Sequence, residues 1–133
     1  MRYLLDVNVL IALGITRHEF HGRIRIWIAS LSAGGVPELS TCSISELGFV
    51  RIVSHIVAYN VTLEQAKTQL DILKASAAYS FSFLNDDHDV SKLPLWVKSA
   101  KHTTDGHLLE LAKANGYTLA TFDENIPGAF LIP

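Results

Sequence analysis

The residues of this chain best suited to chemistry are four carboxylates that lie within or beside apolar segments: Asp6, Glu46, Asp105 and Asp123. Asp6 interrupts the stretch MRYLLDVNVLIAL, where an unpaired buried carboxylate is costly. Clustered carboxylates repel one another unless cations hold them, and Mg²⁺ or Mn²⁺ prefers such oxygen ligands. A site of this kind hydrolyses phosphate esters with metal-activated water and needs no nucleophilic serine or cysteine.

The four acids are far apart in the sequence, so the fold must bring them together. Short β-rich runs alternate with helical stretches, a pattern typical of βαβ units in a parallel sheet covered by helices. The predicted strands are Arg2–Leu5, Leu39–Cys42, Tyr79–Leu84, Tyr117–Thr121 and a short Ala129–Ile132. The predicted helices are His18–Ala33, Ser43–Ser54, Thr62 to about Ala75, Leu93–Lys101 and Thr104–Asn115. We therefore expect an α/β fold: one three-layer αβα domain over residues 1–133, with a mainly parallel sheet of four to five strands.

The predicted elements place the acids at one edge of the sheet. In a parallel α/β sheet, ligands bind beyond the carboxyl ends of the strands. Asp6 follows the first predicted strand and Asp123 follows the fourth. Glu46 lies in the first turn of the helix after the second strand, and Asp105 opens the helix before the fourth. Convergence of the four side chains on Mg²⁺ or Mn²⁺ is the resulting prediction.

Three of the acids also have ordinary structural explanations. Glu46 stands three residues after Ser43, the spacing of a helix capping box. Asp105 could interact with the dipole of its helix, and Asp123 could be a turn residue. Asp6 is the hardest to explain without a partner or a ligand, because a buried carboxylate must either pair or protonate.

Composition limits the class of protein. The 133 residues are 49% hydrophobic, with a net charge of −2 and one cysteine, Cys42. A disulfide framework within the chain is impossible, so a reducing, cytoplasmic setting is the natural interpretation. The apolar stretch Tyr3–Leu13 is broken by Asp6 and Asn8 and is too short to span a membrane. Neither a membrane protein nor a targeting segment is predicted.

Three segments, in order, carry a resemblance that spans essentially the whole chain: LLDVNVLIAL, STCSISELGFVRI and TTDGHLLELAKANGYTLATFDENI. With these segments the chain resembles PIN-domain ribonucleases, specifically the VapC toxins of type II toxin–antitoxin modules. The resemblance implies a parallel sheet flanked by helices and an acidic pocket that binds Mg²⁺ or Mn²⁺ and cleaves single-stranded regions of RNA. By position, Asp6, Glu46, Asp105 and Asp123 match the four family acids.

The resemblance also implies supporting residues around the acids. Asn8 matches a polar position near the pocket, and Thr104 and Thr121 match hydroxyls that orient carboxylates. Thr104 could equally be a helix N-cap, and Thr121 an ordinary strand residue. The sequence departs from the family at Glu124, where many relatives carry a basic residue after TFD.

Partners follow from the same resemblance. A VapC-like toxin pairs with a cognate VapB-like antitoxin, whose C-terminal segment would enter the acidic pocket. A homodimer is also implied, and apolar residues on the early helices could form its interface: Phe20, Trp27, Phe49 and Ile52. Arg17 or Lys101 could position the RNA backbone.

Three alternatives remain open from the residues. The fold could serve as an RNA-binding or partner-binding module without catalysis. A phosphotransfer enzyme of the haloacid dehalogenase type also places an aspartate after its first strand, but needs a second where this chain has Asn8. The third alternative is a zinc site at His18 and His21, which are one helical turn apart. The pair does not form the zinc-protease motif, so a solvated helix face is the favoured interpretation.

Overall fold

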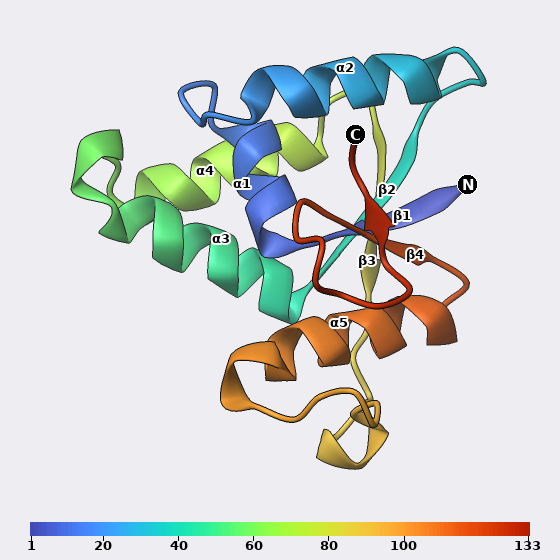
Figure 1. The fold of residues 1–133 in the computed structure, drawn as a ribbon. Helices are drawn as coiled ribbons and strands as arrows, with labels where there is room; N and C mark the ends of the chain where they lie inside the picture. Colours follow the sequence, from blue (N-terminus) through green and yellow to red (C-terminus); the bar gives the residue numbers. More distant parts are fainter.

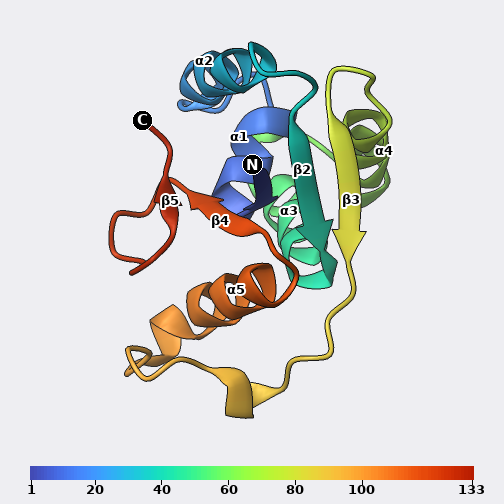
Figure 2. The ribbon, with the colours of Figure 1, turned by 90° about the vertical axis from the view of Figure 1, so that its right-hand side faces the viewer.

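The computed structural model describes residues 1–133 and contains one five-stranded sheet in the order β3-β2-β1-β4-β5. Every pair of neighbouring strands is parallel, as predicted. Figure 2 shows β2 and β3 side by side, with β4 and β5 toward the other edge. The strands are β1 (Arg2–Leu5), β2 (Glu38–Cys42), β3 (Ser80–Leu84), β4 (Thr118–Thr121) and β5 (Phe130–Leu131).

Helices cover both faces of this sheet and confirm the three-layer architecture. The α-helices are α1 (Val7–Gly14), α2 (His21–Ser32), α3 (Ser43–His55), α4 (Leu63–Lys74) and α5 (Thr103–Ala114). Three short 3₁₀ helices are η1 (Val57–Tyr59), η2 (Val90–Lys92) and η3 (Ala100–His102). Helices α1 to α4 gather on one side of the sheet, and α5 lies on the other (Figure 1). No helix is both long and apolar enough to cross a membrane.

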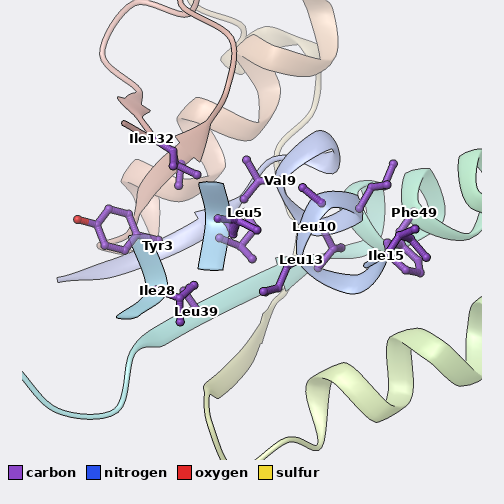
Figure 3. Close-up of a cluster of buried hydrophobic side chains, with 14 of the residues drawn as sticks. Tyr3, Leu5, Val9, Leu10, Leu13, Ile15, Ile28, Leu39, Phe49 and Ile132 are labelled. Atoms are coloured by element: carbon purple, nitrogen blue, oxygen red, sulfur yellow. The ribbon is translucent and has the colours of Figure 1, made fainter. Parts of the chain in front are cut away.

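The sheet separates two hydrophobic cores, and strand alternation assigns each side chain to one of them. Leu5 and Leu39 belong to the larger core with α1 to α4, part of which Figure 3 shows. Leu4 and Leu119 belong to the smaller core with the leucines of α5. A strand residue two positions from one of these leucines therefore faces the same core, and this rule places the polar residues at the strand ends.

Helix α1 was not predicted from the sequence, because it lacks an amphipathic pattern. Six of its eight residues are buried, so the apolar residues do not recur on a single face. Its close packing on α3 depends on a glycine: a Cβ added at Gly48 would lie 2.8 Å from Cγ2 of Val7. This contact fixes the start of α1, directly after Asp6.

The predicted helix Leu93–Lys101 is wrong. The segment forms turns and only its last residues enter η3. Leu95 is 88% exposed whereas the neighbouring Trp96 packs against the smaller core, so the apolar residues do not form one buried helical face. Helix α2 begins at His21 rather than at His18. Trp27 and Phe49 are buried in the larger core, so these two side chains are not available for the dimer interface suggested above.

Candidate active site

Asp6 lies where β1 ends and α1 begins, and it caps that helix. The residue is only 6% exposed. Its Oδ1 accepts the Val7 backbone N–H at 2.7 Å, and its Oδ2 accepts the Thr121 hydroxyl at 2.7 Å. Both donors are neutral, so they support the carboxylate without supplying a positive charge. Burial raises the pKa of Asp6, although these two hydrogen bonds act in the opposite direction.

Thr121 connects the first acid to the fourth. It is the last residue of β4 and, two positions after Leu119, it faces the α5 side of the sheet. Its Oγ1 donates to Asp6 and accepts the backbone N–H of Asp123 at 3.0 Å. The predicted supporting hydroxyl is therefore in contact with one acid and orients the backbone of another.

Asp123 also forms the turn that its position suggested. Its Oδ1 accepts the backbone N–H of Asn125 at 2.8 Å and the side-chain N–H of the same residue at 3.0 Å.

Asp105 lies in the first turn of α5, and its Oδ2 is 3.5 Å from Nδ1 of His102. Thr104 is exposed and is not the N-cap of α5, which is His102.

Asp105 and Asp123 both lie near Asp6, at the carboxyl end of β1. The negative charges of Asp105 and Asp123 each raise the pKa of Asp6 further, beyond the larger effect of burial. No three His, Cys, Asp or Glu side chains stand at the spacing of metal ligands, however. The structure therefore brings Asp105 and Asp123 each close enough to Asp6 to repel its charge, but not to the spacing of ligands around one ion.

Glu46 is not among the acids that raise the pKa of Asp6, and it has partners of its own. Its Oε2 accepts a hydrogen bond from the Lys74 ammonium at 2.7 Å and another from the Thr41 hydroxyl. Thr41, two positions after Leu39, faces the larger core, which is the opposite side of the sheet from Thr121. The capping box expected from Ser43 and Glu46 is wrong, because Cys42 and Ser45 form it instead.

A polar cavity of about 530 Å³ adjoins Asp123, and the exposed Asn8 lines it. His18 also lines this cavity, in the loop before α2. The expected solvated helix face for His18 and His21 is wrong: Nδ1 of His21 lies 2.8 Å from the Ala12 carbonyl oxygen. Sequence analysis missed His18 as a site residue, and its nearness to Asp123 has no signal in the sequence.

Two basic residues that could have neutralised the acids, Arg17 and Lys74, are paired with other groups. The guanidinium of Arg17 donates to the carbonyl oxygens of Ala58 and Tyr59, so it is committed to holding η1. Lys74, which sequence analysis also missed, is the cation paired with Glu46. Asp6, Asp105 and Asp123 therefore lack a protein ammonium or guanidinium partner.

The donor chemistry of the three acids fits a hard divalent cation. Carboxylate oxygens are the ligands that Mg²⁺ and Mn²⁺ prefer, and an added cation would relieve the repulsion that raises the pKa of Asp6. Asp123 has an alternative hydrogen-bond partner in Asn125, whereas Nδ1 of His102, 3.5 Å from Asp105, makes no hydrogen bond. Because the acids do not stand at the spacing of metal ligands, sharing one ion requires their side chains to move closer together.

Comparison with known proteins agrees with this fold. Residues 3–129 match the PIN domain family. Ribonuclease VapC38 of Mycobacterium tuberculosis is 35% identical over 130 residues, covering 92% of this chain and 86% of the relative. Ribonuclease VapC39 of the same organism is 35% identical over 132 residues, covering 92% and 89%.

A solved structure shares the fold at low sequence identity. The crystal structure of VapBC2 from Rickettsia felis, bound to a DNA fragment from its promoter, superposes with a TM-score of 0.64 at 17% identity. It covers 98% of this chain and 97% of that one. Together with the family match and the VapC relatives, the acidic edge at β1 and β4 leads to one conclusion: the chain is a VapC-like member of the PIN domain family.

Proposed function

We propose that this protein is a metal-dependent RNA endonuclease that acts as a VapC-like toxin. The observation that carries the proposal is the buried carboxylate of Asp6, which has only neutral hydrogen-bond donors and lies within electrostatic reach of Asp105 and Asp123. Such an arrangement is unfavourable by itself and becomes favourable with a divalent cation. RNA phosphodiesters are the proposed substrates, and the cytoplasm is the proposed location.

Asp6, Asp105 and Asp123 would hold Mg²⁺ or Mn²⁺. When bound, the ion supplies positive charge against the phosphate and makes water acidic enough to act near neutral pH. Thr121 holds Asp6 through its hydroxyl and holds the Asp123 backbone through its oxygen, so it fixes two of the three ligands relative to each other. Glu46, the fourth predicted acid, would join the ion only after release from Lys74.

The test is cleavage of a long unstructured RNA by the purified protein. We expect fragments in Mg²⁺ or Mn²⁺ and none in excess EDTA, with activity restored when the ion is added back. Cleavage that persists in EDTA would contradict the proposed chemistry. RNA binding without cleavage in either ion would favour the non-catalytic module instead.

A VapB-like antitoxin is the proposed partner. A groove of about 780 Å³ runs along α3 and reaches Thr104, beside Asp105. Leu47 and Leu63 line it and are 66% and 52% exposed, so an apolar segment could cover them and continue to the acids. Co-expression with a short neighbouring reading frame should give a stable complex without nuclease activity; for Leu47→Asp we expect weaker binding of that partner.

A homodimer is proposed from the family. Ile26 on α2 is 75% exposed and remains available for such a contact, unlike the buried Trp27 beside it. Light scattering of the purified protein should give twice the monomer mass of 14.6 kDa. A monomer at micromolar concentration would contradict this part of the proposal.

A further inference from the structure

The cavity beside Asp123 is lined by aromatic and neutral polar side chains as well as by carboxylates. It lies between Asn8, the segment His18–Phe20 and the segment Phe122–Glu124, with a volume of about 530 Å³. The cavity therefore opens directly onto one of the proposed metal-holding residues. Its lining combines an amide, an imidazole, two aromatic rings and three carboxylates.

His18 offers the cavity one hydrogen-bond donor. Its Nδ1 accepts the backbone N–H of Phe20 at 3.0 Å, so the ring hydrogen of neutral His18 is on Nε2. Nε2 makes no hydrogen bond within the chain. Burial lowers the pKa of His18, which keeps the ring neutral at pH 7. The side chain is therefore suited to donate one hydrogen bond to an uncharged group.

Two aromatic rings supply an apolar surface in the same cavity. The rings of Phe20 and Phe122 have their centroids 4.9 Å apart. The guanidinium of Arg23 lies 5.2 Å and 5.0 Å from the two centroids, and it donates to the carbonyl oxygens of Ile132 and Pro133. Arg23 therefore supports the rings and is not a cation of the cavity lining. Partly buried aromatic rings of this kind stack with nucleobases.

The charges of the lining exclude one kind of ligand. Glu19, Asp123 and Glu124 are all acceptors, and no lysine or arginine lines the cavity. A phosphate group would be repelled here, whereas the amino group of a base would find several carboxylate oxygens. Asn8 adds one amide that both donates and accepts.

We infer that this cavity binds one nucleobase of single-stranded RNA beside the scissile phosphate, and that it prefers adenine, cytosine or guanine over uracil. The inference rests on the proposed RNA cleavage and names what selects the cleavage position. Stacking on Phe20 and Phe122 would hold any base, whereas Glu124 would accept from an exocyclic amino group that uracil lacks. The acidic residue at 124, where the resemblance leads one to expect a basic one, thereby becomes a specificity residue.

The experiment uses five fluorescent oligouridylates whose central position is A, C, G, U or abasic. Binding is measured by anisotropy in EDTA, and cleavage position and kcat/KM are measured in Mn²⁺. We expect the wild-type protein to bind the amino-bearing bases about fivefold more tightly than uracil, and the abasic oligonucleotide most weakly.

Two variants separate the roles within the cavity. For Glu124→Gln we expect the preference over uracil to fall to less than about twofold, since an amide accepts less strongly than a carboxylate. His18→Asn keeps an acceptor for the Phe20 N–H but removes the Nε2–H, and we expect it to weaken binding of every base equally. Glu64→Gln, an exposed acid on α4, is the matched control and should change neither property.

The outcomes distinguish this inference from the proposed function. Equal binding of all five oligonucleotides, or no binding of any, would overturn the base site, as would an unchanged preference in Glu124→Gln. Base-selective binding without cleavage in Mn²⁺ would leave the base site standing and overturn the nuclease. Thermal melting of each variant shows whether the fold is intact.

Discussion

Asp6 and Glu46 both follow a strand of the same sheet, yet the fold treats their charges in opposite ways. Glu46 has the Lys74 ammonium at 2.7 Å, and 22% of its side chain is exposed. Asp6 has two neutral donors, two neighbouring acids and almost no contact with solvent. The charge of Glu46 is matched within the chain, whereas Asp6 has no cationic partner among the side chains.

The sheet itself produces this difference. Successive side chains of a strand point to opposite faces, so Thr41 and Thr121 direct their hydroxyls to different sides. Thr121 supports Asp6 on the α5 side, and Thr41 supports Glu46 on the side of α4. The number of acids near one end of a sheet therefore does not give the number that can share an ion.

The largest effect is expected from Asp6→Asn, which keeps the shape of the side chain and removes its charge. We expect RNA cleavage in Mn²⁺ to fall by at least about 100-fold while the far-ultraviolet circular dichroism is unchanged. Asp71→Asn, an exposed acid on α4, is the control and should keep full activity. A fully active Asp6→Asn protein would remove the central residue of the proposed site.

The next effect tests whether Glu46 binds the same ion as Asp6, by the rise in melting temperature that Mn²⁺ causes. At Mn²⁺ concentrations about 100 times Kd, a bound ion stabilises the folded state by about 2.7 kcal/mol, so the melting temperature should rise by roughly 5–10 °C. We expect Asp6→Asn to lose this rise and Glu46→Gln to keep most of it, since Glu46 is paired with Lys74. Loss of the rise in both variants would show that the two acids share the ion after all.

A smaller effect is expected when the partner of Glu46 is removed. Lys74→Met leaves a largely buried carboxylate with one hydroxyl donor, and we expect the free energy of unfolding to fall by about 1–2 kcal/mol. Lys67→Met breaks the exposed pair with Glu64 on the same helix and should cost less than about 0.5 kcal/mol. Urea denaturation of both variants measures the difference, and equal losses would contradict the comparison.

The smallest effect is the pH dependence of Asp6 in the presence of a chelator. Because its pKa is raised in the folded protein, the charged form costs stability. This cost is absent below the pKa of an unfolded aspartate, about 3.9, and appears as the pH rises through the folded pKa. We therefore expect Asp6→Asn to be more stable than the wild type at pH 7, with the difference disappearing toward pH 4. A constant difference across this range would exclude titration of Asp6 as its cause.

Much of the fold was predictable, because it depends on local patterns. Four of the five strands and most of α3, α4 and α5 were predicted within a few residues, since apolar periodicity and a capping box mark them. The short β5 was predicted as a slightly longer strand. Helix α1 was missed, because its burial on nearly all sides removes the period that identifies a helix.

The candidate site, like the fold, was predictable only in part. The sequence by itself identified four carboxylates, Asp6, Glu46, Asp105 and Asp123, that follow or precede predicted strands, because residue type and strand order are local properties. Only the tertiary structure decided that Lys74 reaches Glu46 and that His18 lies beside Asp123. These contacts depend on which face each strand end presents and on how α4 and the loop before α2 pack, and such long-range geometry has no signature in residue spacing.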